Sequence, residues 1–205
     1  MSNIRRTMMA AGRRGGSAVD WESIARGMVD FTTPFSVPAE LVTTIPNQAY
    51  NGRVGLQAIE IPDTITTIGT AAFIGCKNLQ HITLPNALTE LKSQLFYNCS
   101  NLSNVVVPNS VTTIGSSAFG GCNRLSKIDI GTGITSIGGQ CFYHNYPLTM
   151  IIRATTPPSL GSNNTSLGNA SSTIYVPDES VAAYKAASDW SAYAAKIYPI
   201  SEYTE

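Results

Sequence analysis

Four cysteines and two histidines are the side chains best suited to chemistry in this 205-residue chain. Cys76, Cys99 and Cys122 are each 23 residues apart, so they share one position of a regular pattern. Zinc sites built from cysteine typically contain C-x-x-C pairs, and the sequence has none. A disulfide, a metal site and burial as small apolar side chains remain the alternatives, and the regular spacing favours burial. The same is expected of Cys141, which falls in a column of small residues.

The two histidines, His81 and His144, have no nucleophile beside them in the sequence. His81 is expected on the outward side of a strand, and His144 lies next to Tyr143. The motifs G-x-S-x-G, H-E-x-x-H, the P-loop and a complete G-x-G-x-x-G do not occur. We therefore predict a protein that is not an enzyme, with no catalytic residue, no metal and no cofactor.

The composition indicates a single compact domain with short appendages, because 43% of the residues are apolar and only 13% are charged. Thirteen basic and thirteen acidic residues cancel, so no overall field attracts nucleic acid or an anionic membrane. No stretch reaches the roughly 18 to 20 apolar residues of a membrane span, and residues 1–16 lack the apolar core of a secretory signal. We expect neither a nucleic-acid partner nor a membrane span, and no export by that route.

A repeat of 23 residues organises the chain, and five units follow without insertion at 39–61, 62–84, 85–107, 108–130 and 131–153. One aromatic column and one aliphatic column define it: Tyr50, Phe73, Phe96, Phe119 and Phe142; and Ile45, Ile68, Leu91, Ile114 and Ile137. Such columns are buried only by stacking one unit on the next, which predicts a solenoid of mainly β-structure with short turns. Each unit contains a short extended piece, a tight turn with the aromatic residue, and a second strand such as 125–130.

The repeat pattern resembles the BspA-like leucine-rich repeat family of bacterial surface antigens and adhesins. Ile68-Gly69, Ala72-Phe73 and Gly75-Cys76 carry the resemblance, as do the equivalent residues 114–122. It implies a leucine-rich-repeat solenoid of five 23-residue coils plus a partial sixth. Units 1 and 5 depart from the pattern, as the end units of a solenoid do.

The two ends of the chain are expected to differ from the repeats. Residues 154–205 predict a last strand at 173–177 and a helical C-terminal cap, with helix starts at Asp178 and at Ser188-Asp189. Residues 1–38 predict a basic arm and a short helix that together anchor the chain to a partner. The anchor residues are Arg5, Arg6, Arg13, Arg14, Trp21, Ile24 and Met28. A disordered tail and a nucleic-acid contact are the alternatives for the arm, although four arginines without aromatic residues are few for the latter.

The outward side chains of the second strand of each unit are the candidate binding surface, because stacked strands present a rigid grid. The residues are Gln57, Glu60, Gln80, His81, Thr83, Asn104, Val106, Lys127, Asp129, Met150 and Ile152. The alternative is a solvated sheet face whose scattered apolar residues bind nothing.

The function expected from these features is a non-enzymatic interaction or adhesion module. The opening of the chain resembles leucine-rich-repeat proteins carried by phages and prophages of gut bacteria. That resemblance implies a virion component, a fibre or decoration protein that attaches to a host glycan or surface protein, and the chain could form a homo-oligomer. The alternative is a bacterial cell-surface adhesin or antigen of the BspA type.

Overall fold

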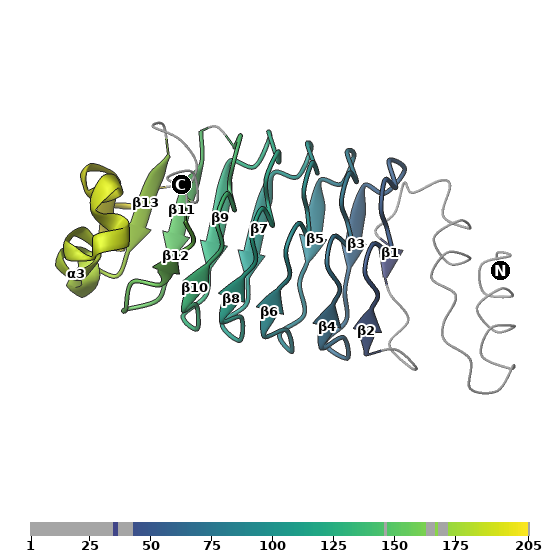
Figure 1. Ribbon diagram of the computed structural model, residues 1–205, viewed down its shortest axis with the longest axis horizontal. Coiled ribbons are helices and arrows are strands. Elements are labelled where there is room, and N and C mark those ends of the chain that lie inside the picture. The colour runs from purple at the N-terminus through teal and green to yellow at the C-terminus, as the bar shows by residue number, and fades with distance from the viewer. Residues whose placement is uncertain (1–34, 37–42, 146, 163–166, 168–171, 205) are drawn as a thin grey trace, which may run out of the picture.

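The computed structural model describes residues 35–36 and 43–204, apart from 146, 163–166 and 168–171. In these residues the backbone winds into a row of stacked coils, with strands along two sides and helices at the C-terminal end (Figure 1). The predicted solenoid of mainly β-structure with a small helical cap is confirmed. The anchor residues expected between Arg5 and Met28 lie outside the described residues, so the anchor stays a prediction.

Each coil carries one short strand and one longer strand, and all strands pair in parallel. The short strands are β2 (Thr44–Ile45), β4 (Thr67–Ile68), β6 (Glu90–Leu91), β8 (Thr113–Ile114), β10 (Ser136–Ile137) and β12 (Ser159–Leu160). The other side holds β1 (Phe35–Ser36), β3 (Ala58–Glu60), β5 (His81–Thr83), β7 (Asn104–Val107), β9 (Lys127–Ile130), β11 (Thr149–Ile152), β13 (Thr173–Val176) and β14 (Ile197–Pro199). The strand expected at 173–177 is β13, whereas β1 and β14 are additional strands that the repeat period did not predict.

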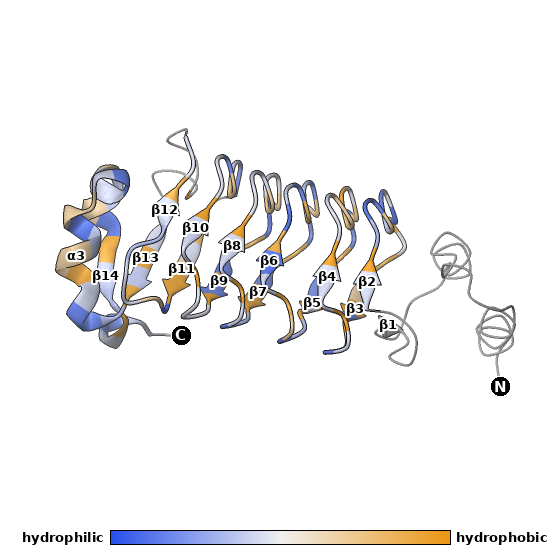
Figure 2. Cartoon of the chain, turned by 60° about the horizontal axis from the view of Figure 1, so that its bottom comes forward, coloured by the Kyte–Doolittle hydropathy of each residue, from blue (hydrophilic) through white to orange (hydrophobic). Residues whose placement is uncertain are grey.

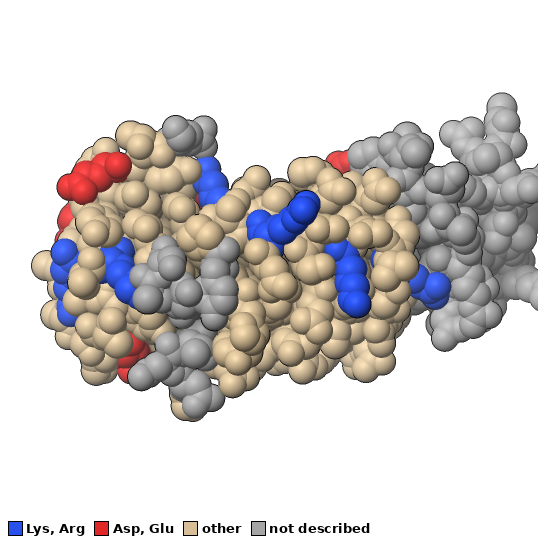
Figure 3. Space-filling view, turned by 90° about the horizontal axis from the view of Figure 1, so that it is seen from above, with Lys and Arg blue, Asp and Glu red and all other residues tan. Residues whose placement is uncertain are grey.

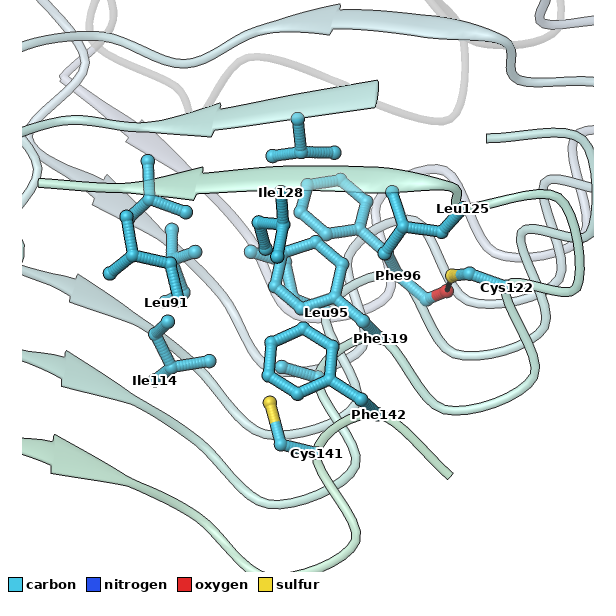
Figure 4. Packing of buried hydrophobic residues seen from close by; sticks show 14 of the residues in the cluster. Leu91, Leu95, Phe96, Ile114, Phe119, Cys122, Leu125, Ile128, Cys141 and Phe142 are labelled. Carbon is cyan, nitrogen blue, oxygen red and sulfur yellow. Dashed lines mark hydrogen bonds between the residues drawn. The ribbon is translucent and has the colours of Figure 1, made fainter. Parts of the chain in front are cut away.

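The interior is filled by the repeated columns, and the aromatic column forms a continuous stack. Neighbouring rings from Tyr50 to Phe142 have centroids 5.0, 5.5, 5.3 and 5.5 Å apart. Figure 4 shows three of these rings, with aliphatic side chains from both strand rows around them. Buried residues alternate with more exposed ones along β7 and β9, and Figure 2 shows hydrophobic and hydrophilic residues following one another along the coils. Burying a side chain of this size contributes about 1.5 to 3 kcal/mol, so the stack supplies a large share of the stability.

Both rows of strands are divided at one place, between the second and the third coil. The sheets are β1-β3-β5 and β7-β9-β11-β13-β14 on one side, and β2-β4 and β6-β8-β10-β12 on the other. The aromatic turns nevertheless continue across the division, since the Phe73 amide donates to the Leu95 carbonyl at 3.0 Å. The two blocks of coils are therefore joined by their turns and their core.

The residue after the short strand accounts for this division in the short-strand row. In four coils it is glycine, as in Gly115, whose amide donates to the Leu91 carbonyl at 2.7 Å. A Cβ at Gly115 would overlap the backbone nitrogen of Ser93 in the preceding coil. The third coil carries Lys92 at this position. Because a lysine has a Cβ, the third coil cannot approach the second as closely as Gly115 allows the fourth to approach the third.

Replacing Gly115 with alanine is expected to open the short-strand row between the third and fourth coils as well. The loss of several ladder hydrogen bonds should lower the free energy of unfolding by about 1 to 3 kcal/mol, measured by urea denaturation. Lys92→Gly is the matched opposite change and should raise stability. It removes the exposed 3.0 Å ion pair with Glu90, which contributes little, and the gain in ladder hydrogen bonds should exceed the backbone entropy that a glycine loses on folding, about 0.5 to 1 kcal/mol. A change in the free energy of unfolding of the same sign and size in Gly115→Ala and Lys92→Gly would contradict the role of the Cβ at this position.

The C-terminal cap covers the last coil. It consists of α3 (Val181–Ala186) and the 3-10 helices Asp178–Ser180, Ser188–Lys196 and Ile200–Glu202. Tyr184 and Trp190 are fully buried, and they donate hydrogen bonds to the carbonyls of Ala154 at 2.9 Å and Pro158 at 2.8 Å. No helix in the described part of the chain combines the length and apolar character needed to cross a bilayer.

The helices begin at the expected residues, but the side chains expected to cap them form other hydrogen bonds. The Asp178 carboxylate accepts from the amide of Ser201 at 3.1 Å, and the Asp189 carboxylate accepts from the amide of Leu160 at 3.2 Å. Neither helix beginning at these residues has a side-chain cap bond. The two aspartates instead bind backbone groups distant in sequence, and Asp189 in this way ties the cap to β12.

Candidate functional site

We call the outward side chains of β3, β5, β7, β9, β11, β13 and β14 the repeat face. Two columns form it, because alternate residues of a strand point to the same side. Within the five-stranded sheet, one column contains Asn104, Lys127, Thr149 and Thr173, and the other contains Val106, Asp129, Ile151, Tyr175 and Tyr198. Of the candidates predicted in the first four units, from Gln57 to Asp129, Gln57 and Gln80 directly precede β3 and β5. The others lie on the repeat face.

Exposure along the repeat face is uneven. Gln57, Glu60, Gln80, His81, Thr83 and Asn104 are exposed, and Val106 is 68% exposed in the middle of the face. Lys127 and Asp129 are half-buried. A valine side chain that is two-thirds exposed on a rigid strand is available to a partner at no cost in rearrangement.

The expectation that Met150 and Ile152 face outward is wrong, because both are fully buried. Strand β11 pairs Met150 with Ile128, an offset of 22 residues where earlier coils keep 23. The cause is one residue fewer in the turn between Asn145 and Thr149 than between Cys122 and Lys127. A shift of one residue turns every side chain of a strand to the other face.

The shifted register places Ile151 in the outward column, between Asp129 and Tyr175. Its side chain is nevertheless only 3% exposed. The apolar end that the sequence predicted for this surface is therefore absent at the fifth coil.

A group of tyrosines occupies the C-terminal end of the repeat face, which the sequence did not predict as a site. The rings of Tyr175 and Tyr198 are 6.1 Å apart, and Tyr203 meets Tyr175 edge to face at 5.1 Å. The Lys127 ammonium lies 5.0 Å from the centre of the Tyr203 ring. Tyr198 is 40% exposed, so this group presents flat aromatic surface beside a cation.

A bidentate ion pair lies next to the tyrosines. Arg153 donates from Nε and Nη2 to the two carboxylate oxygens of Asp129, both at 2.7 Å. This hydrogen bonding raises the pKa of the Arg153 guanidinium further, against a smaller opposing effect of burial. Since Arg153 is 47% exposed, the pair fixes side-chain orientation more than it adds stability.

The four cysteines are buried and free, which is the core-packing alternative of the three considered. The thiols of Cys76, Cys99 and Cys122 donate to the carbonyls of Tyr50, Phe73 and Phe96 in the preceding coils, at 2.9, 3.1 and 3.1 Å. Asn145 takes the same place in the fifth coil and donates to the Phe119 carbonyl at 3.0 Å. In the described ranges, no three His, Cys, Asp or Glu residues gather as a metal site would require.

The 23-residue repeat matches a known protein family. The model of the BspA-type leucine-rich repeat region matches residues 43–166 in six copies, more than half of the chain. The chain belongs to the BspA-type leucine-rich repeat family. The five coils and partial sixth expected from the sequence agree with the six copies of this family's repeat.

Two solved structures illustrate the similarity of this BspA-type chain to known proteins. One is a leucine-rich cell surface protein of Faecalibacterium prausnitzii, 28% identical, with a TM-score of 0.56 over 65% of this chain. The other is the pneumococcal vaccine antigen PcpA, 19% identical, with a TM-score of 0.61 over 81% of this chain, which shows the shared fold alone. The chain spans only 33% and 39% of the lengths of these two structures. No curated protein sequence matches the chain.

Proposed function

We propose that this chain is a non-enzymatic binding module of a bacterial surface protein, and that the repeat face contacts a host protein or glycan. The 28% identical relative is described as a cell surface protein, which supports this setting. The proposal is the alternative that the sequence left open. The phage virion component, the first expectation, stays a prediction, because none of the compared proteins supports it.

The observation that carries the proposal is the exposed side-chain chemistry of the repeat face. Val106 lies among polar residues of neighbouring coils, and the tyrosine group with Lys127 lies farther along the same sheet. Interfaces are enriched in tyrosine and in apolar residues surrounded by a polar rim. Parallel strands hold these side chains in fixed positions, so little side-chain entropy is lost on binding.

Replacing Val106 and Tyr198 with aspartate is expected to reduce binding without unfolding the protein. Both side chains are exposed, so the change should shift the melting temperature by only a few degrees. Beads coated with the protein are passed over a layer of mucus-secreting epithelial cells, and bead retention should fall about tenfold. Thr89→Asp, exposed on the short-strand side, is the control and should retain the beads as wild type does. Unchanged retention of the double variant would remove the repeat face as the binding surface.

The cellular setting has its own test. An antibody raised against residues 43–204 is applied to intact cells of the source bacterium and to purified phage particles from the same culture. Labelling of intact cells is expected under the proposed function. Labelling of particles alone would favour the virion component, in which case removing residues 2–33 should prevent incorporation into the particle.

A further inference from the structure

The turns of the coils form a surface that neither the repeat face nor the proposed function uses. We call its turn segments 46–56, 69–79, 92–102, 115–125 and 138–148 the basic ridge. These segments hold four cations and no acidic residue: Arg53, Lys77, Lys92, which pairs with Glu90 at 3.0 Å, and Arg124. The acidic residues of the described coils lie outside these segments. A chain with zero net charge therefore has a positive surface on one side of its solenoid.

The cations follow the solenoid axis. Figure 3 shows separate basic groups in a row on this side, with an acidic group only at the margin of the coils. Lys77 and Arg124 are exposed, and Arg53 is half-buried one coil before Lys77. Equivalent residues of successive coils are about 4.8 Å apart, so Lys77 and Arg124 are separated by roughly 10 Å along the axis.

Fixed neutral groups fill the space between these cations. The third coil places Ser100 and Asn101 where its neighbours carry Lys77 and Arg124. The Ser100 hydroxyl donates to the Lys77 carbonyl at 3.4 Å, and the Asn101 amide donates to the Asn78 side chain at 3.3 Å. These hydrogen bonds hold a row of hydroxyl and amide groups in register with the charges.

The aromatic side chains of Tyr97 and Tyr143 lie in the ridge segments of the third and fifth coils. Tyr143 is 37% exposed, and its ring is 3.8 Å from the ring of His144, tilted by 55°. Tyr97 is half-exposed two coils earlier in the same column. Rings in these positions offer flat apolar surface on the same turns that carry the cations.

We propose that the basic ridge binds an anionic polysaccharide that lies along the solenoid axis. Widely spaced cations match a polymer whose negative charges are separated by neutral sugar units. The fixed amides and hydroxyls match its hydroxyl groups, and the aromatic rings match the apolar faces of its rings. Double-stranded DNA carries about one charge per 1.7 Å, far denser than the cations of the ridge. The inference is independent of the proposed function, because it concerns a different surface.

The test measures binding of the full chain to dextran sulfate, with uncharged dextran as the matched neutral polymer. All proteins carry serine at positions 5, 6, 13 and 14, because four arginines in one segment bind polyanions by themselves. The double variant Lys77→Ser with Arg124→Asn uses side chains found at these positions in the third coil, so folding should be preserved. We expect the affinity for dextran sulfate at low salt to fall about tenfold in this variant. Uncharged dextran should bind at least tenfold more weakly than dextran sulfate to the unchanged ridge.

The control variant, Lys185→Ser with Lys196→Asn, removes the same charge from the cap and should leave the affinity unchanged. An equal loss in the control would show attraction by overall charge and would overturn the proposal. So would an unchanged affinity of the ridge variant. Single-stranded DNA and polyglutamate of equal charge are measured in parallel, and tighter binding of either polymer would also overturn it.

Discussion

Replacing Phe96 with alanine is expected to lower the free energy of unfolding by about 3 to 5 kcal/mol. Phe96 is fully buried in the centre of the aromatic stack, 5.5 Å from the Phe73 ring and 5.3 Å from the Phe119 ring. The change leaves a cavity in the third coil, and the neighbouring coils cannot fill it without breaking their own stacking.

The position of Phe96 makes the loss larger than its own contacts suggest. The strand rows are already divided between the second and third coils, so the stack and the turns hold the two blocks together there. Urea denaturation should show the lower stability and a less cooperative transition, because coils stabilise one another mainly through neighbours. Phe96→Leu keeps most of the volume and should cost well under half as much. A loss below about 1 kcal/mol for Phe96→Ala would contradict this role of the stack.

Raising the pH from 7 to 9.5 under reducing conditions is expected to lower the free energy of unfolding by about 4 kcal/mol. The hydrogen bond with Cys76, together with burial, raises the pKa of Cys99 far above its ordinary range, and burial is the main cause of the raised pKa values of Cys122 and Cys141. In the unfolded chain each thiol has a pKa of about 8.5.

The sign of the effect follows from proton binding. Above pH 8.5 the unfolded chain loses thiol protons that the folded chain keeps, so stability falls as the pH rises. One pH unit above 8.5, each of three thiols costs about 1.4 kcal/mol. Below pH 8 the contribution is constant.

Cys122→Ser is the matched control, because serine keeps a donor for the Phe96 carbonyl and does not titrate in this range. Between pH 7 and 9.5 the free energy of unfolding of this variant should fall by about two thirds as much as that of the wild type, because two of the three thiols remain. The buried phenols of Tyr50 and Tyr184 also have raised pKa values through burial, but they add their loss only above pH 10. A pH-independent stability up to 9.5 would contradict the burial of the thiols.

The candidate surface was predictable only as far as the period stayed constant. Glu60, Thr83 and Val106 are exposed as the 23-residue spacing predicted. Met150 was misplaced because the shorter turn before β11 changes the register by one residue. The sequence does show the pattern that identifies Tyr175 as outward, since Ile174 and Val176 on either side are apolar.

The amino-acid sequence by itself determined the solenoid, its buried columns and the place of the helical cap. A repeat copies one local geometry at a fixed spacing, so equivalent residues meet equivalent neighbours and their types report burial directly. For this reason the aromatic stack followed from spacing, and the spacing favoured buried cysteines over a disulfide or a metal site.

Only the tertiary structure decided the face of β11, the division of the strand rows at Lys92 and the meeting of Tyr175, Tyr198 and Tyr203. Each of these depends on how closely one coil lies against the next or on the register between them. A single residue in a turn, or one Cβ at a close contact, changes that fit while leaving the repeat pattern almost unaltered.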